Sequence, residues 1–306
     1  MNNSEISSLG ITEFDHAFHV RLTEFNIRRL SPHIIGPGWI DEIKTESALR
    51  IAEGQFLEAE RSGVRRLAST APRDVEGFAA WFEGLREHGP GQNDPLFPWL
   101  ETEATLAQMR WFLTQEAAGE AGFDDLVAMT QVKLPVRAKL EMARNFWDEM
   151  GRGHERGMHG PMLTTVVNEL RLTPTVKDTC WESLALANLM VGLAANRRYT
   201  YHAIGALGAI EMTAPARVSL VNEGLRRLGV AASARKYYQI HAGLDIQHSK
   251  AWNKEVIYSL VAANPQTASS IAEGALLRLA SGARCFERYR THFDLEAVHT
   301  HSALAA

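Results

Sequence analysis

The chain has 306 residues, a formal net charge of -4, 45% hydrophobic residues and 22% charged residues. This composition is typical of a globular protein of one or two domains with a deep core. Because the charge is slightly negative and Lys and Arg are scattered, we expect no nucleic-acid partner. The start, MNNSEISSLG, lacks the parts of a secretory signal, and the most apolar run, residues 184–195, is too short to span a bilayer. We therefore expect a cytoplasmic protein with no membrane partner.

Helical periodicity dominates the chain, and no alternating strand pattern or internal repeat is convincing. Residues 38–69 predict one long helix or a broken pair of helices. The segment EHGPGQNDPLFP, residues 87–98, is the strongest linker because it is dense in Gly, Pro, Asn and Asp. The helices expected after it cover residues 101–118, 122–130, 135–150, 160–171, 175–198, 199–213, 215–228, 232–262 and 265–293. Proline or glycine marks most of the joints between them, including Pro161 and Pro215.

These elements predict an all-α protein. Residues 96–295 are expected to form a bundle of about seven core helices. Residues 1–95 would form a smaller helical N-terminal region, and residues 296–306 a tail.

The segment HAGLDIQH, residues 241–248, carries polar side chains on one helix face. His241, Asp245 and His248 stand at positions i, i+4 and i+7, which fall within a sector of about 60°. The two histidines would lie about 10 Å apart along the helix axis, which suits two neighbouring metal ions better than one. A solvated polar stripe is the alternative, but apolar residues flank the same side, so the stripe borders the core.

Glu211 lies on an apolar stripe in the segment AIGALGAIEMTAP, residues 203–215. The glycines and alanines that precede it form a small-residue surface, which allows close helix packing. A carboxylate in such a place is costly unless it is paired or bound to a metal. The alternative to a metal is a salt bridge to an arginine such as Arg217.

The segment NFWDEMGRGHERGMHGP, residues 145–161, interrupts a helix. In one straight helix Glu149 and His159 would lie about 15 Å apart along the axis, too far to share an ion. The segment contains four glycines, Gly151, Gly153, Gly157 and Gly160. They permit the backbone to leave the helix, turn and start a new one, so that the carboxylate and the imidazole converge. We expect His154 to be exposed, and Asp148 either supports a ligand or is a charge near the turn.

Two further glutamates, Glu116 and Glu120, lie around one side of the helix expected in residues 110–126. Either could supply another carboxylate to a metal site, and a surface or salt-bridged role fits each equally well.

Together, four predicted helices supply three imidazoles and three carboxylates: Glu149, His159, Glu211, His241, Asp245 and His248. This ligand set suits iron or manganese, and the chain has no thiolate set for structural zinc. Helical bundles build dinuclear carboxylate sites from inward-facing Glu and His side chains on facing helices.

The pattern resembles the haem-oxygenase-like diiron oxidases, a family also described as iron-containing redox enzymes. The resemblance rests on FWDEMGRG followed by a histidine, on Glu211 in its Gly/Ala-rich helix, and on the H-x3-D-x2-H run at 241–248. It covers roughly residues 96–295. It implies a seven-helix haem-oxygenase-like fold, two iron ions per chain and dioxygen activation.

The resemblance also implies a division of the ligands. One iron would take Glu149, His159 and His241, and the other would take Asp245 and His248, with Glu211 near or between the two. Some members add a carboxylate from the preceding helix, for which Glu116 is the first choice and Glu120 the reserve.

Members of this family catalyse N-oxygenation of amino acids or guanidines, oxidative decarboxylation of fatty acids to terminal alkenes, or carbon–carbon cleavage of amino acids. The resemblance therefore implies a dioxygen-dependent oxidoreductase that acts on a small carboxylate-bearing substrate. Electrons would come from an external donor, since no flavin or ferredoxin-like segment is present, and a homodimer is possible. Arg197 and Arg198 could bind a substrate carboxylate in bidentate fashion, or could be surface or ion-paired residues.

Three other classes of protein are open. A haem enzyme of the same fold would need one proximal histidine and no surrounding carboxylates. A metal-free relative, such as a thiamine-degrading hydrolase, would need an activated cysteine. Cys180 and Cys285 have no histidine-and-acid setting visible in the sequence, and we expect buried free thiols and a reducing compartment. The third class is a non-enzymatic helical interaction protein.

Overall fold

The computed structural model describes residues 14–34 and 36–295, and all regular structure in these ranges is helical apart from one isolated bridge between Met150 and Met158. The expected all-α fold is confirmed. The tail predicted for residues 296–306 lies outside the described residues.

The structure begins with three helices, α2 (His16–Leu30), α3 (Trp39–Ala68) and α4 (Val75–His88). After the predicted linker come α5 (Leu96–Thr102), α6 (Leu106–Ala118), α7 (Phe123–Thr130), α8 (Val136–Glu149), α9 (His159–Glu169) and α10 (Trp181–Ala195). The last part contains α11 (Thr200–Arg227), α12 (Ala232–Ala251), the π-helical turn η5 (Trp252–Ile257), α13 (Tyr258–Ala263) and α14 (Thr267–His292).

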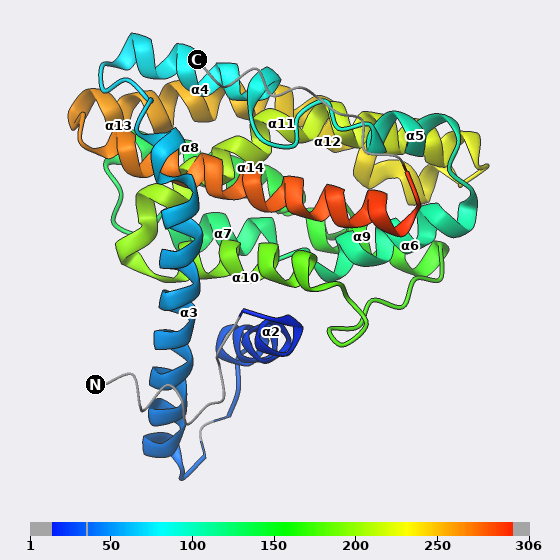
Figure 1. Cartoon of the computed structure of the whole chain (residues 1–306), viewed down its shortest axis with the longest axis horizontal. Coiled ribbons are helices and arrows are strands. Elements are labelled where there is room, and N and C mark those ends of the chain that lie inside the picture. Colours follow the sequence, from blue (N-terminus) through cyan, green and yellow to red (C-terminus); the bar gives the residue numbers. More distant parts are fainter. Residues whose placement is uncertain (1–13, 35, 296–306) are drawn as a thin grey trace.

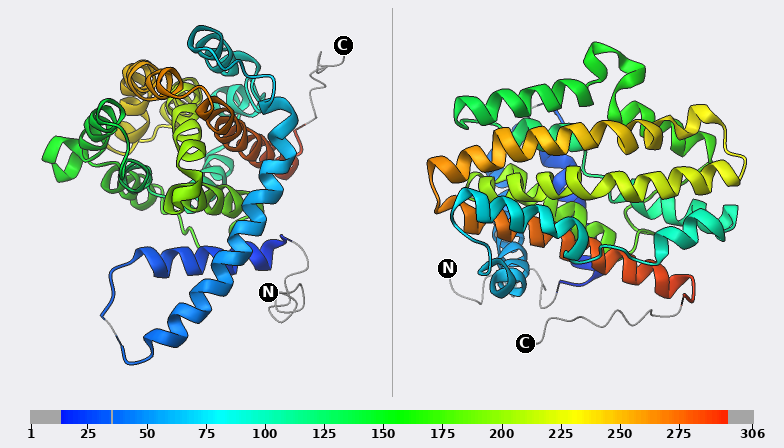
Figure 2. Two further views of the ribbon diagram at one scale, coloured as in Figure 1. Left: turned by 90° about the vertical axis from the view of Figure 1, so that its left-hand side faces the viewer. Right: turned by 90° about the horizontal axis from the view of Figure 1, so that it is seen from above.

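Helix α11 organises the bundle, because it packs along both α12 and α14 and also contacts α5, α10 and η5. Helix α3 crosses one side of the bundle, and its N-terminal half extends beyond it beside α2 (Figures 1 and 2). Buried residues of these N-terminal helices, such as Phe18, Phe56 and Phe82, belong to the same apolar cluster as Leu207 of α11. The N-terminal region and the bundle therefore share one core.

The joint expected at Pro215 is wrong, because α11 runs without a break from Thr200 to Arg227. A proline inside a helix removes one hydrogen bond, here to the carbonyl of Glu211, and packing on several sides holds the helix together. The helix expected over residues 101–118 is instead divided. Thr105 starts α6 with a capping box, in which its side chain and that of Gln108 each bind the other's backbone N–H.

Helix α11 is also long and apolar enough to cross a membrane by length and composition, over Arg197–Arg227. In the structure 56% of the relevant window is buried inside the protein. The buried residues of α11 include Glu211 and Asn222, which a core helix accommodates through polar partners. We therefore interpret α11 as the core helix of the bundle.

The small-residue surface of α11 does allow close packing, as the sequence indicated. A methyl group at Gly205 would collide with the carbonyl oxygen of Ile271 on α14, and one at Gly274 would collide with that of His202 on α11. A methyl group at Gly208 would lie 2.8 Å from Cδ1 of Ile257 and 2.9 Å from the Trp252 ring. These glycines set how closely α14 and η5 approach α11.

We predict that Gly274→Ala lowers the free energy of unfolding by about 2 kcal/mol or more, because the added methyl group forces two backbones apart. Gly243→Ala is the matched control, since Gly243 is an exposed helical glycine with nothing within 4 Å of the added methyl group. It should stabilise the protein by about 0.5–1 kcal/mol. Urea denaturation followed by circular dichroism measures both, and equal effects of the two substitutions would contradict the packing argument.

Candidate metal centre

The interrupted helix brings two predicted ligands together. Helix α8 ends at Glu149 and α9 begins at His159, and two short 3-10 turns, Gly151–Gly153 and Glu155–Gly157, lie between them. Met150 and Met158 pair across the turn in an antiparallel bridge. The bridge places the last residue of α8 next to the first residue of α9.

The backbone of the turn requires glycine at two of these four positions. Gly151 has a φ of 60°, and a methyl group there would lie 2.5 Å from the carbonyl carbon of Gly157. Gly153 has a φ of 84°, a conformation that residues with a side chain rarely adopt. Gly160 lies inside α9, and a methyl group there would meet nothing within 4 Å. His154, between the turns, is exposed, as expected.

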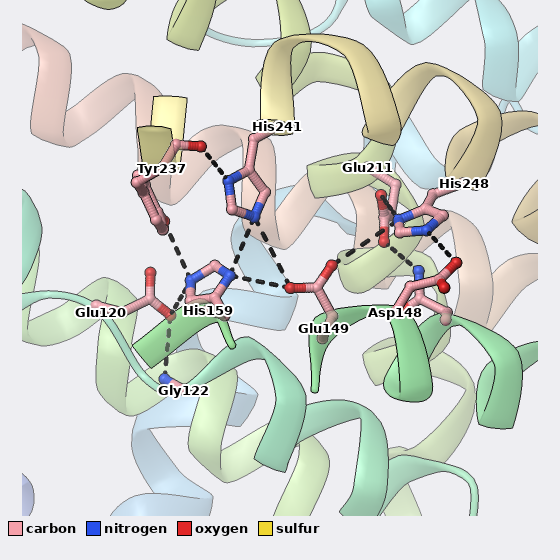
Figure 3. Close-up of polar contacts among 10 residues, drawn as sticks. Glu120, Gly122, Asp148, Glu149, His159, Glu211, Tyr237, His241 and His248 are labelled. Atoms are coloured by element: carbon pink, nitrogen blue, oxygen red, sulfur yellow. Dashed lines mark hydrogen bonds and ion pairs between the residues drawn. The ribbon is translucent and has the colours of Figure 1, made fainter. Parts of the chain in front are cut away.

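The ligand atoms gather in two groups, each within 4.8 Å (Figure 3). In the first group His159 Nδ1 lies 3.0 Å from Glu149 Oε2 and 3.1 Å from His241 Nε2. In the second group His248 Nδ1 lies 3.8 Å from Glu149 Oε1 and 3.7 Å from Glu211 Oε2. Glu149 therefore directs one carboxylate oxygen toward each group.

This arrangement differs in part from the division of ligands that the resemblance implies. The first group contains the three residues expected for one iron. In the second, Glu149 accompanies His248 and Glu211, so Glu149 is the residue common to both groups and Glu211 lies with the second. Asp245 belongs to neither group, but it lines the adjacent cavity, and its Oδ1 is buried without a hydrogen-bond partner.

Hydrogen bonds outside the groups orient two of the imidazoles. His241 Nδ1 donates to the backbone carbonyl of Tyr237 at 2.7 Å, which leaves Nε2 free to face Glu149 and His159. His248 Nε2 donates to Asp148 Oδ2 at 3.1 Å, and Asp148 Oδ1 also accepts from Arg152 Nε. Such partners of the second imidazole nitrogen are typical of metal-binding histidines. Of the two roles open for Asp148, the structure therefore favours support of a ligand.

Two neighbours of the ligands were not predicted. Asn145 Nδ2 donates to Glu211 Oε1 at 2.6 Å, and the Tyr237 hydroxyl lies 3.1 Å from His159 Nε2. Each stands four residues before a ligand on the same helix, Asn145 before Glu149 and Tyr237 before His241. A search of the i-4 positions could have found both.

Arg217, the alternative partner of Glu211, instead donates to Thr213 Oγ1 and lies over the rings of Phe97 and Phe286. In the described residues Glu211 thus has an amide partner and no arginine partner.

Three buried carboxylates lie in one region, and the electrostatics reflect it. Burial raises the pKa of Glu211 well above its usual value, and the charges of Asp245 and Glu149 raise it further. Burial also raises the pKa of Asp245 to about 7, with His241 opposing and Glu149 reinforcing the shift. Like charges in a site of low polarity favour the neutral forms unless a cation is present.

The pKa values of Glu149 and His159 shift in the directions that favour the charged form of each side chain. Burial works against both charged forms, but the hydrogen bond with His159 and the nearby His241 outweigh it and lower the pKa of Glu149 to about 2. Burial likewise lowers the pKa of His159, yet the nearby carboxylates of Glu120 and Glu149 raise it to about 10. A proton on His159 thus supplies positive charge where a metal ion would supply it.

The residues fit divalent metal ions. His248 Nδ1 and Asp245 Oδ1 are buried polar atoms without partners, and His248 Nδ1 faces two carboxylates. Imidazole and carboxylate ligands suit iron or manganese. A bound cation would satisfy these atoms and relieve the repulsion among the acids.

The sequence favoured Glu116 over Glu120 as an additional carboxylate ligand, whereas in the structure Glu120 is the one that lies beside the ligands. Glu116 accepts a hydrogen bond from the Tyr289 hydroxyl at 2.8 Å, and it does not line the cavity beside the ligands. Glu120 lines that cavity, and its Oε1 lies 3.9 Å from His159 Nε2. The reason is that α6 ends at Ala118, so the chain beyond it turns Glu120 toward the site.

A cavity of about 120 Å³ lies next to both groups. Neither Arg197 nor Arg198, the two candidates for binding a substrate carboxylate, lines it. Arg197 is exposed and donates to the backbone carbonyls of the last two residues of α7, while Arg198 lies over the ring of Tyr199. The free thiols Cys180 and Cys285 do not line it either, and burial raises the pKa of both.

Comparison with known proteins agrees with this centre. The sequence profile described as iron-containing redox enzyme matches residues 110–283, more than half of the chain. The chain belongs to the iron-containing redox enzyme family, whose fold is haem-oxygenase-like.

One similar solved structure is a CADD-like protein of unknown function from Nostoc punctiforme PCC 73102. Its sequence is 16% identical, the match covers 77% of this chain and 97% of that one, and the TM-score is 0.50. At this identity the likeness concerns the fold alone. No curated protein matches this chain.

We predict that the parent protein binds two ferrous ions per chain and that His248→Ala binds about one, because His248 contacts one group. Glu149→Gln should bind less iron than His248→Ala, because Glu149 faces both groups. Iron is measured by inductively coupled plasma mass spectrometry after loading under argon and desalting. His154→Ala, which changes an exposed histidine nearby, is the control and should retain two. An unchanged iron content in Glu149→Gln would contradict the assignment.

We also predict that Gly151→Ala weakens iron binding at least tenfold, because the added methyl group opens the turn that joins Glu149 to His159. Gly160→Ala should bind iron as the parent does. Competition with a chromogenic chelator gives both affinities. Equal affinities in the two variants would show that the tight turn is not required for the site.

Proposed function

We propose that this protein is a dioxygen-dependent, non-haem diiron oxidase that acts on a small carboxylate-bearing molecule. The observation that carries the proposal is the position of Glu149, with one oxygen toward each of two buried groups of imidazole and carboxylate ligands. Membership of the iron-containing redox enzyme family supports iron as the metal and oxidation–reduction as the reaction class.

In this proposal Glu149, His159 and His241 hold one iron. Glu149, Glu211 and His248 hold the other, and Asp245 supplies a further carboxylate from the cavity wall. When bound, the two ions would supply electrons to dioxygen and so allow oxidation of a C–H or N–H bond.

Other residues of the site prepare it for a substrate. Phe123, Leu126, Met190 and Ile210 line the cavity next to the ligands and limit the water around them. Burial raises the pKa of Tyr237 well above its usual value, so its hydroxyl keeps its proton 3.1 Å from His159 Nε2. A mainly apolar lining with a few polar groups is typical of a site for a small organic molecule.

The alternatives are less well supported. A haem group needs an apolar environment and one axial histidine, whereas four acids line this cavity: Glu120, Glu149, Glu211 and Asp245. A cysteine hydrolase needs a reactive thiolate in the cavity, and neither thiol lies there. An external electron donor, a homodimer and a cytoplasmic location remain parts of the proposal.

We predict that the ferrous protein, mixed anaerobically with a suitable substrate and then with dioxygen, consumes oxygen and develops a transient visible absorption band. Stopped-flow absorbance and an oxygen electrode measure this across two panels, aliphatic and aromatic amino acids, and fatty acids of different lengths. Metal-free protein is the control for background oxidation. If protein loaded with two irons per chain consumed no oxygen with any candidate, the proposal of an oxidase would fail.

A further inference from the structure

The cavity beside the metal centre has two chemically different walls. One contains ligands of both groups, including Glu149 and His159, together with Asp245. The rest is mainly apolar, apart from Glu120, Tyr237 and Arg278 of α14. Arg278 is the one Lys or Arg among the described residues that line the cavity. A cation in a largely apolar wall needs a physical explanation.

Arg278 has no bonded partner within the described part of the chain: its guanidinium makes neither a hydrogen bond nor an ion pair there. Glu116 and Glu120 lie near enough to attract it. However, Glu116 is hydrogen-bonded to Tyr289, and Glu120 accepts the backbone N–H of Gly122 and lies beside His159. The nearby acids therefore leave the donors of Arg278 unused.

Neighbouring arginines have bonded partners, unlike Arg278. Arg217 donates to Thr213 and lies over two phenylalanine rings, and Arg284 donates to both oxygens of Glu60, although its Nε is buried without a partner. Arg278 is partly buried, so its guanidinium keeps only part of its hydration, and no acceptor compensates for the rest. Such a group is stabilised when a ligand brings an acceptor.

A glycine on the same helix makes room for this side chain. Gly282 lies one turn after Arg278, and a methyl group there would lie 2.7 Å from Arg278 Nη1. The guanidinium therefore lies over the position where any other residue would have a side chain. Gly282 allows Arg278 to keep this position at the cavity.

We infer that Arg278 binds the carboxylate of the substrate, and that the substrate is a carboxylic acid with an apolar body. Arginine offers two parallel N–H groups to a carboxylate, a strong and directional contact. The body would lie along Leu126, Met190 and Ile210, which line the same cavity, and would extend toward the metal ligands. The inference rests on the proposed function, since it names the substrate class of that site.

The chemistry fits two sources, a fatty acid or an apolar amino acid, which share the carboxylate and the apolar body. The acids in the cavity wall repel an anion, and Arg278 is the one Lys or Arg among the described lining residues that attracts it. A neutral amide of the same shape would accept hydrogen bonds but would lack the charge. Comparing these molecules separates recognition of the carboxylate from simple filling of the cavity.

The test measures binding by isothermal titration calorimetry to the full-length protein, both loaded with ferrous iron under argon and metal-free. The probes are straight-chain carboxylates of four to ten carbons, the amide of the tightest binder, and its 2-amino derivative. We expect Arg278→Gln to weaken carboxylate binding at least tenfold in both forms, and Arg278→Lys to weaken it less. The amide should bind the parent weakly and should be indifferent to Arg278→Gln.

Two further variants control for folding. Gly282→Ala should weaken carboxylate binding by displacing the guanidinium, while the melting temperature stays equal or rises because alanine favours the helix. Arg198→Gln, which changes an exposed arginine outside the cavity, should bind as the parent does. The 2-amino derivative identifies the source: tighter binding than the plain acid favours an amino acid, and weaker binding a fatty acid.

The inference is overturned if no carboxylate binds the parent, if the amide binds as well as the acid, or if folded Arg278→Gln binds the acid as tightly as the parent. These outcomes are distinct from failure of the proposed function. A metal-free protein whose carboxylate binding depends on Arg278, but which takes up no iron, would keep this inference and reject the diiron oxidase. A protein that takes up two irons per chain, but whose carboxylate binding does not depend on Arg278, would support the diiron oxidase and reject this inference.

Discussion

The carboxylate of Glu149 is the group on which the rest of the site depends. It ends α8, and its two oxygens face two different sets of ligands. For this to happen the chain must turn back within nine residues so that His159 returns to the same place, which explains the left-handed conformations of Gly151 and Gly153. Helix α12 then needs to present histidines two turns apart, one for each set.

The ligands must converge around Glu149, and this requirement also bears on the packing of α11 and the chemistry of the site. Glu211 is 98% shielded from solvent on the central helix, where only close neighbours such as Asn145 can reach it. Burying several acids together raises the pKa of Glu211 and Asp245 and so opposes the charged forms. Metal binding would remove this cost, and folding of the site and metal binding would therefore be coupled. The cavity with Arg278 lies on the open side of this assembly.

Much of this could be predicted from local patterns. The helices followed from their periodicity, and His241, Asp245 and His248 from their spacing on one face. What could not be predicted depends on contacts between distant segments. The sharing of Glu149 arises from where α11 and α12 meet α8, and the choice of Glu120 over Glu116 arises from the end of α6 at Ala118.

The role of Arg278 and the unbroken course of α11 were not predicted either, because they too depend on contacts between distant segments. Arg197 and Arg198 were the candidates for binding a substrate carboxylate, but both are exposed. Arg278 stands in an ordinary helical stretch, and only the fold brings it to the cavity. Likewise, Pro215 is a helix breaker by local rules, and tertiary packing of α11 overrides them.

Anomalous X-ray diffraction at the iron edge, from crystals of protein loaded with ferrous iron under argon, tests the central claim most directly. The account predicts two iron peaks per chain, one contacting Glu149, His159 and His241 and the other contacting Glu149, Glu211 and His248. A single peak, or two peaks with Glu149 bound to only one of them, would contradict it.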